Sequence, residues 1–230
     1  MLIFTHQAWQ LLAFIAAYFT ATFLFKSWNI PDNSFLRISI YHWFIISLII
    51  PFIHQTYIFI IWRMELYYKL ISKVFKEKAF KIHAVLFNIF LLLRLAMCLI
   101  LGFTDYNSLI IDFSLRVIFI IILLVPALYT FYSLIRYFSF TRAAGYDHFN
   151  TAAYKDDFIV KKGMFKYSKN AIYKYGALII WALAFIFASK ALLINGLFCH
   201  LLIWVHYYTT EKPDMDYIYK KKKDLSDSEK

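Results

Sequence analysis

The residues that could do chemistry are concentrated in two short stretches of the last third of the chain. The first, Asp157–Gly176, is rich in lysine, tyrosine and asparagine, and the second, His206–Tyr219, contains His206 and Glu211. A carboxylate, an amide and lysine ammonium groups supply donors and acceptors for a small charged molecule. His206 could act as a proton acceptor beside Glu211, or it could be a head-group-level histidine without a role. These two stretches are the candidate site.

Several other kinds of site are not supported by the sequence. It contains no Gly-x-Gly-x-x-Gly loop, so a Rossmann-type nucleotide site is not expected. A Gly-x-Ser-x-Gly motif and a cysteine–histidine arrangement are also missing. Zinc needs three or four ligands, whereas His42 and His54 fall on different helix faces and Cys199 with His206 lacks further ligands. We therefore expect no metal, and a cofactor that is held in another way.

The composition indicates a membrane protein. Of the 230 residues, 62% are hydrophobic, compared with about half in an ordinary soluble domain. The apolar residues form blocks, and the basic residues that give a net charge of +11 lie between the blocks and at the C-terminus. This distribution favours anionic lipid head groups as neighbours. Nucleic acid is not expected as a partner, because no basic stripe lies outside the loops that flank the apolar blocks.

A membrane-spanning helix needs roughly 20 mostly apolar residues. Four segments meet this requirement: Trp9–Phe25, Ile40–Trp62, His83–Phe103 and Ser108–Phe138. The final apolar region, Tyr175–Tyr208, is divided by Lys190, and each half is short for a spanning helix. We predict a tight helical hairpin with Lys190 and Asn195 near its turn, and one long tilted helix is the alternative. The predicted fold is all-α, a polytopic bundle of about six spanning helices.

Basic residues predict the orientation of this bundle. They are concentrated after the second span (Arg63, Lys69, Lys73, Lys76, Lys78 and Lys81), after the fourth span (Arg142 to Lys174) and in the C-terminal tail. The positive-inside rule places these segments, and both termini, in the cytoplasm. Apolar residues alternate with lysines at helical spacing near residues 63–80, which predicts a helix lying in the membrane interface.

Three charged residues, Arg94, Asp112 and Arg116, fall within the predicted spans. Charged groups in hydrocarbon normally pair or face a cavity. Arg94 could reach Asp112 from the neighbouring helix. Either these residues line a polar pocket or they form a structural pair near the outer interface.

The predicted organisation has three parts. Residues 1–140 form N-terminal transmembrane helices together with the interfacial helix. Residues 141–220 form a cytosol-facing cofactor region and the transmembrane hairpin. Residues 221–230 are charged and are expected to be disordered.

The two candidate stretches resemble the superfamily of isoprenylcysteine carboxyl methyltransferases and phospholipid N-methyltransferases. In that superfamily, Gly-x-Tyr/Phe is followed by Arg-His/Asn-Pro-x-Tyr, an apolar helical hairpin and a Glu-Glu pair. Gly163 and Phe165 stand at the first of these motifs, and Lys169, Asn170 and Tyr173 stand at the second.

After the hairpin, Glu211 stands at the first glutamate of the pair. Pro213, Ile218 and Tyr219 keep the spacing of the phospholipid branch, so the resemblance covers roughly the last 65 residues. Three positions depart from the pattern: Ala171 replaces proline, Lys169 replaces arginine and Lys212 replaces the second glutamate.

The resemblance implies a membrane methyltransferase that uses S-adenosylmethionine (SAM) and acts on a lipid or lipid-like acceptor. An amino head group is favoured, and a prenylated cysteine carboxylate or a small hydrophobic thiol is the alternative. It implies that Glu211 receives the ammonium of SAM, that Lys169 meets its carboxylate, and that Asn170 bonds its polar groups. The site would be completed by Gly163 and by aromatic rings that enclose the adenine or the sulfonium, namely Phe165, Tyr167 and Tyr173. The expected catalytic residues are Tyr173, His206 and Glu211.

Two other functions remain open at the level of sequence. Membrane sterol reductases share a related C-terminal hairpin fold and bind NADPH. A non-catalytic accessory protein that keeps a decayed motif would explain the three departures.

Overall fold

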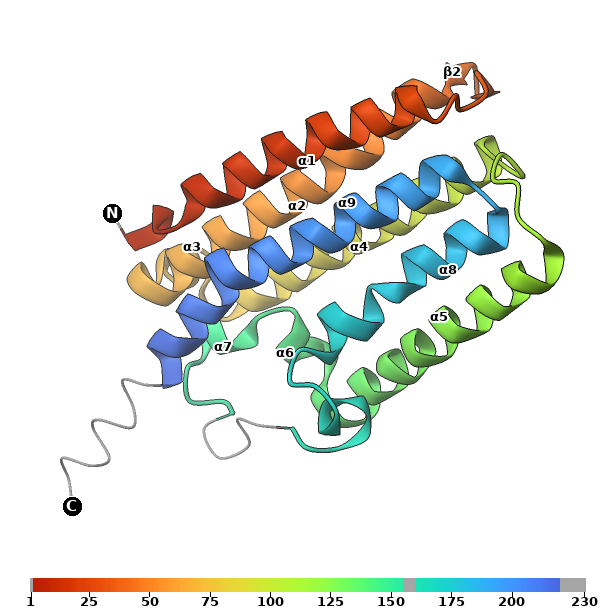
Figure 1. Cartoon of the computed structure of the whole chain (residues 1–230). Helices are drawn as coiled ribbons and strands as arrows, with labels where there is room; N and C mark the ends of the chain where they lie inside the picture. The colour runs from red at the N-terminus through yellow and green to blue at the C-terminus, as the bar shows by residue number, and fades with distance from the viewer. Residues whose placement is uncertain (1, 155–159, 220–230) are drawn as a thin grey trace.

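The computed structural model describes residues 2–154 and 160–219. The long helices are α1 (Gln7–Ser27), α2 (Ile40–Tyr68), α4 (Ala79–Thr104), α5 (Phe113–Ser133), α8 (Leu178–Phe187) and α9 (Lys190–His206). Figure 1 shows these helices side by side, alternating in direction along one bundle. The predicted all-α bundle with a C-terminal hairpin is confirmed.

Short elements complete the chain. They comprise helices α3 (Leu70–Phe75), α6 (Phe140–Ala143) and α7 (Tyr146–Phe149), the 3-10 turns Leu2–Phe4, Lys76–Lys78 and Gly163–Lys166, and the antiparallel strands β1 (Ser34–Phe35) and β2 (Ile38–Ser39). In the described part of the chain, the long helices are extended or preceded by three π-helical segments: Leu134–Phe138, Ile172–Gly176 and Tyr207–Glu211.

Among the residues that the structure describes, five helices are long and apolar enough to cross a membrane: Gln7–Ser27, Ile40–Tyr68, Leu70–Thr104, Phe113–Phe138 and Lys190–Tyr219. The first four correspond to the four predicted spans. Ile172–Phe187 is apolar but shorter, so a sixth crossing by this helix stays a prediction.

Helix α9 occupies the middle of the bundle. It packs against α1, α2, α4 and α8, whereas α5 packs mainly on α8 (Figure 1). The largest cluster of buried apolar side chains lies along this line and includes Phe44, Leu101, Leu192, Phe198 and Leu202. Helix α9 is therefore fixed by four neighbouring helices. Side chains at its C-terminal end are held in place by this packing.

A buried carboxylate fixes the turn between α8 and α9. One oxygen of Asp105 accepts hydrogen bonds from the Ser189 hydroxyl (2.8 Å) and from the backbone N–H of Ala191 (2.7 Å). The Ser189 hydroxyl also accepts from the backbone N–H of Leu192, which caps the first turn of α9. Lys190 is the first residue of α9, so the hairpin is confirmed and the single long helix is excluded.

Asn195 was expected near this turn, and that expectation is wrong. It lies inside α9, where its side-chain amide donates to the hydroxyl of Ser47 on α2 at 2.9 Å. A buried amide needs such a partner, so the residue joins two helices instead of ending one.

The charged residues within the spans are structural. The Asp112 carboxylate caps α5 by accepting from the backbone N–H groups of Ser114 and Leu115. Arg116 donates to the carbonyl groups of Phe185 and Ile186 at the end of α8. Within the described part of the chain, no ion pair joins Arg94 to Asp112, so the pairing that the sequence suggested is not found.

The segment after the second span also differs from expectation. Helix α2 continues to Tyr68, so Arg63 lies in the helix and is only 1% exposed, instead of belonging to a basic loop. Helix α3 comes next, and none of its residues is buried. Its placement at a membrane surface stays a prediction, and the predicted disordered tail, residues 221–230, lies outside the described residues.

Arg63 forms a buried ion pair with Asp214, with 3.0 Å between Nε and the carboxylate. Breaking such a pair from one side typically costs about 3–5 kcal/mol, because the remaining charge stays buried. We predict that Arg63→Met lowers the melting temperature in detergent by roughly 10 °C. Adding Asp214→Asn to this variant should restore part of the loss.

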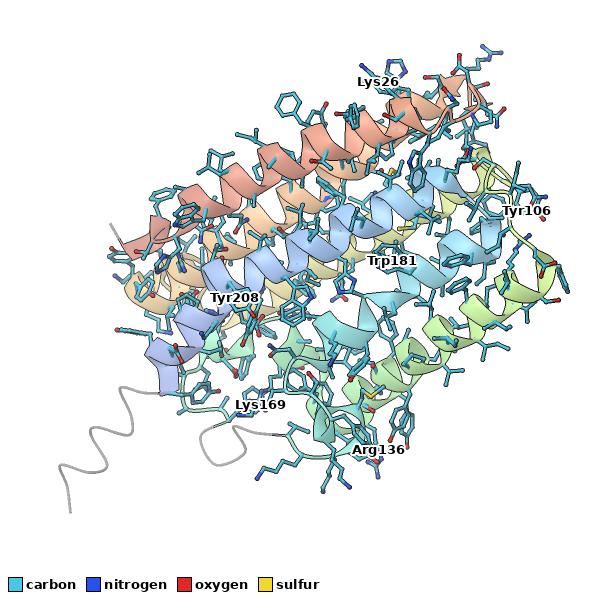
Figure 2. The ribbon with its side chains drawn as sticks, in the orientation of Figure 1. Lys26, Tyr106, Arg136, Lys169, Trp181 and Tyr208 are labelled. Atoms are coloured by element: carbon cyan, nitrogen blue, oxygen red, sulfur yellow. The ribbon has the colours of Figure 1, made fainter. Side chains whose placement is uncertain are left out.

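The matched control is Lys26→Ala, because Lys26 is exposed at the opposite end of the bundle (Figure 2). Its effect should stay within about 0.5 kcal/mol. A melting temperature for Arg63→Met equal to that of the control would show that the pair does not stabilise the fold.

Candidate functional site

The hairpin brings the two candidate stretches into contact. The hydroxyl of Tyr173 donates a hydrogen bond to the carboxylate of Glu211, although 38 positions separate the two residues in the sequence. Glu211 is not part of a loop, because helix α9 continues through it to Tyr219. The predicted meeting of these two residues is confirmed.

Both residues lie in π-helical segments. Tyr173 belongs to Ile172–Gly176 and Glu211 to Tyr207–Glu211. A π-helical turn is rare and occurs frequently at functional sites, because the wider helix redirects side chains and frees backbone groups. Two such segments facing one another mark this end of the bundle as the candidate site.

The π segment of Glu211 has a visible physical cause. The carbonyl oxygen of Thr209 accepts hydrogen bonds from Nη2 of Arg63 (2.9 Å) and from the side-chain amide of Gln7 (3.3 Å). These two donors come from other helices. They supply hydrogen bonds to the Thr209 carbonyl, which in a regular helix would accept one from a backbone N–H group of the same helix.

The loop that precedes Tyr173 is packed against the end of α5. Gly163 has a positive φ of 56°, and a Cβ at this position would lie 2.4 Å from the hydroxyl oxygen of Ser133. The backbone N–H of Met164 donates to that same hydroxyl group at 2.9 Å. Gly163 therefore has a structural reason to be glycine, and a role in holding a cofactor stays a prediction.

Phe165 belongs to the small core of this loop. It is 4% exposed, and its ring stacks on Phe138 with 4.7 Å between centroids and 11° between planes. Because Phe138 covers one face of the ring, Phe165 offers less surface to an adenine than the sequence suggested. Its predicted contact with the cofactor remains untested.

A basic hollow opens beside this core. It has a volume of about 460 Å³ and is lined by Lys161, Phe165, Lys166, Tyr167, Ser168 and Lys169. Tyr167 is 70% exposed. Figure 2 places Lys169 toward the end of the bundle that is opposite to Lys26 and Tyr106. Three lysines make the hollow suited to an anionic group such as a carboxylate or phosphate.

Asn170 follows this hollow directly in the chain. Its backbone N–H donates to the Ser168 hydroxyl (3.3 Å), and its carbonyl accepts from the backbone N–H of Lys174. These bonds begin the turn that carries Tyr173, so Asn170 is placed between the hollow and the Tyr173–Glu211 pair.

His206 does not join the Tyr173–Glu211 pair. Its ring lies 5.8 Å from the ring of Trp62 on α2, and the side chain is 4% exposed. Within residues 2–154 and 160–219, neither ring nitrogen has a hydrogen-bond partner. Its role as a proton acceptor stays a prediction.

Two aromatic residues that were not singled out in the sequence lie at the pair. The ring of Tyr173 is 6.1 Å from that of Trp204 and 5.7 Å from that of Tyr207. Trp204 and Tyr207 precede Glu211 by seven and four positions, so helical spacing could have indicated that they share its face.

A buried polar network supports the same end of the bundle and was also missed. One carboxylate oxygen of Asp214 pairs with Arg63. The other lies 3.4 Å from Nε2 of His148. The ring of His148 stacks on Trp62 at 4.3 Å. Gly145 makes this stack possible, because a Cβ there would lie 2.3 Å from Trp62. A charged residue in an apolar helix normally has a partner. Arg63 could therefore have indicated this network from the sequence.

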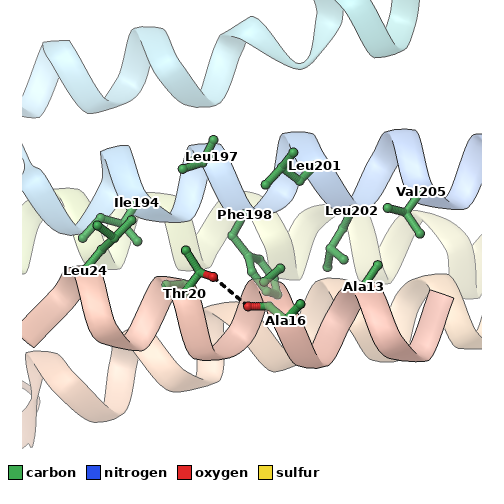
Figure 3. Close-up of a pocket in the computed structure, with 12 residues that line it drawn as sticks. Ala13, Ala16, Thr20, Leu24, Ile194, Leu197, Phe198, Leu201, Leu202 and Val205 are labelled. Carbon is green, nitrogen blue, oxygen red and sulfur yellow. Dashed lines mark hydrogen bonds between the residues drawn. The ribbon is translucent and has the colours of Figure 1, made fainter. Parts of the chain in front are cut away.

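An apolar groove runs between α1 and α9 (Figure 3). Its volume is about 300 Å³, and its lining includes Ala13, Ala17, Leu197, Leu201 and Val205. The hydroxyl group of Thr20 bonds the carbonyl of Ala16 at 2.8 Å, so it is not free for a ligand. The groove thus offers hydrocarbon surface along the membrane-spanning part of α9.

Among the described residues, no group of three or more histidine, cysteine, aspartate or glutamate side chains could hold a metal ion.

A model of the phospholipid methyltransferase family matches residues 115–222. These residues form a domain of the phospholipid methyltransferase family. The domain includes α5 from its third residue, both hairpin helices and the Tyr173–Glu211 pair, and it starts ahead of the predicted boundary after residue 140. Arg63 lies outside it. No curated protein and no solved structure matches the chain.

The predicted relationship to the isoprenylcysteine and phospholipid methyltransferases is confirmed for this part of the chain. Together with the five long apolar helices, it shows an integral membrane protein that carries a methyltransferase domain.

The close contact between Gly163 and Ser133 can be tested by substitution. Gly163→Ala must place a side chain against Ser133 at a strained φ, which costs about 1–3 kcal/mol. We predict a melting temperature in detergent lower by roughly 4–8 °C. Gly196→Ala is the matched control, since its Cβ would meet other atoms only at 3.5 Å or more. Equal melting temperatures for the two variants would contradict the tight packing of the loop.

Proposed function

We propose that the protein transfers a methyl group from SAM to a lipid or lipid-like acceptor, with an amino head group favoured, at the cytoplasmic interface of the membrane. The observation that carries this proposal is the contact between Tyr173 and Glu211. It unites, across the hairpin, the two motifs of a phospholipid methyltransferase domain.

The residues at this end suit the chemical groups of SAM. The Glu211 carboxylate can bind its ammonium, and the lysines of the hollow, Lys169 among them, can bind its carboxylate. Asn170, between these two places, has both donors and acceptors for its remaining polar groups. When bound, SAM supplies a methyl group that is already activated by the sulfonium charge. The protein therefore has to align the acceptor, exclude water and accept a proton, without a catalytic triad.

Tyr173 positions the carboxylate. Its hydroxyl group donates to one oxygen of Glu211, which leaves the second oxygen for a ligand ammonium. Glu211 and His206 are the proposed acceptors for a proton from the acceptor amine. His206, which is buried beside Trp62, would act only through a water molecule or a movement of its ring.

The α1–α9 groove supports a lipid as the acceptor. It is almost entirely apolar, and it ends at Val205, six positions before Glu211 on the same helix. An acyl chain along the groove would leave its head group at the Tyr173–Glu211 end. The surrounding lysines favour a phosphodiester next to that head group.

The cofactor assignment is tested by measuring SAM affinity in detergent. Loss of a charged hydrogen bond is worth about 1.5–3 kcal/mol, so Glu211→Gln should raise the Kd for SAM by about 10- to 100-fold. Asn170→Ala should raise it about fivefold. Glu77→Gln, at an exposed turn, is the control and should leave the Kd unchanged.

Unchanged affinity in both Glu211→Gln and Asn170→Ala would remove the site assignment. Tight NADPH binding without SAM binding would instead support a reductase, and binding of neither would support an accessory protein.

The proposed orientation places both termini and the lysine-rich loops in the cytoplasm. We predict that Tyr167→Cys reacts with a membrane-impermeant thiol reagent only after the cytoplasmic side has been opened. Leu36→Cys, at the opposite end and 71% exposed, should react in intact cells. The native cysteines are buried and serve as the unreactive background. The reverse labelling pattern would show an inverted topology.

A further inference from the structure

Three aromatic rings form a corner at the Tyr173–Glu211 pair. The ring centroids of Tyr173, Trp204 and Tyr207 are separated by 5.7, 5.8 and 6.1 Å, so they form a nearly equilateral triangle. The ring planes are inclined to one another by 55°, 65° and 88°. A cation above the middle of this triangle lies within cation–π range, about 6 Å, of all three centroids.

The corner differs from an ordinary aromatic belt. Aromatic residues at a membrane interface are common, and each usually faces the lipid on its own. Here the rings come from two π segments and the end of α9, and one of them is bonded to a carboxylate. All three rings are partly exposed.

The chain already places one cation on the outer side of this aromatic cluster. The ammonium nitrogen of Lys212 lies 6.0 Å from the ring centroid of Tyr208, which in turn packs on Trp204 with 6.0 Å between their ring centroids. Lys212 is the residue that replaces the expected second glutamate. It therefore lies against Tyr208, which also contacts Tyr207 with 5.0 Å between ring centroids, and not against Tyr173, Trp204 or Tyr207.

The corner also continues from the apolar groove. Along the helix, spacings of four, three and four separate Leu197 and Leu201, which line the groove, from Trp204 of the corner and its neighbour Tyr208. Side chains at these spacings lie along one stripe of a helix. A molecule with an apolar tail in the groove can therefore present its polar end to the corner.

We propose that Tyr173, Trp204 and Tyr207 bind the amino head group of the acceptor lipid, which gives up its proton before the methyl group is transferred, and that they favour its cationic, methylated forms over neutral head groups. This inference rests on the proposed function, in which Glu211 binds SAM. Methyl transfer leaves a positive charge on the acceptor nitrogen, and aromatic faces favour a cation whose methyl groups weaken its hydration.

Measuring lipid binding directly tests this inference without relying on methyltransferase activity. The probes are a phosphocholine lipid and its neutral 3,3-dimethylbutyl isostere, in which carbon replaces the quaternary nitrogen, each offered to the full chain in nonionic detergent. Wild-type protein should bind the cationic lipid about tenfold more tightly than the isostere. Trp204→Ala and Tyr207→Ala should reduce this preference to about twofold or less, whereas Tyr207→Phe should keep it because the ring face remains.

Trp9→Ala is the control for loss of a tryptophan, because Trp9 is 67% exposed on α1, outside the corner. The Kd for SAM is measured on every variant, and Trp204→Ala should change it less than about twofold, since the corner is assigned to the acceptor.

Two results would overturn the inference. One is equal binding of the two lipids by wild-type protein. The other is a tenfold loss of SAM affinity in Trp204→Ala, which would assign the rings to the cofactor. Absence of SAM binding with an intact lipid preference would contradict the proposed function and support the corner as a cation site.

Discussion

The guanidinium group of Arg63 holds together the end of the bundle that carries the candidate site. It bonds the Asp214 carboxylate, the carbonyl groups of Ile3 and Thr5 at the start of the chain, and the carbonyl of Thr209 within a π segment. A buried arginine is tolerated only where its donors and its charge are matched, and all of these partners are found here. The bond to Thr209 widens α9 just before Glu211, so the position of the candidate carboxylate depends on a residue in another helix.

Composition and hydropathy were sufficient to predict the bundle. The four N-terminal spans and the hairpin follow from apolar blocks of sufficient length, and lipid imposes regular helices on such blocks. Asn195 shows where this reasoning failed. A polar residue in an apolar region suggests a turn. Inside a helix, however, a buried partner such as Ser47 can supply the hydrogen bond that its side chain needs. Arg63 was misplaced for the same reason, because its partner lies 151 positions away and cannot be seen locally.

The site was predictable to a similar extent. The motifs identified Tyr173 and Glu211, and the hairpin required them to meet. The spacing of Trp204 and Tyr207 places them on the helix face of Glu211, but their contact with Tyr173 depends on tertiary structure, including the hydrogen bonds from other helices to Thr209. Phe165 was given a role at the cofactor, whereas the structure shows that its ring also packs on Phe138. An aromatic residue in a motif can serve the packing of its own loop, and only the fold distinguishes the two uses.

The ion pair between α2 and the end of α9 has a consequence for how the protein is made. Helices enter the membrane in the order of synthesis, so α2 is inserted well before Asp214 leaves the ribosome. During that interval Arg63 has a charge and no carboxylate to meet it, and its long side chain must reach for the head groups. The Arg63–Asp214 pair can form only after the helix that follows α9 is in place. A chain that stops before Asp214 would leave the buried charge of Arg63 without its carboxylate partner.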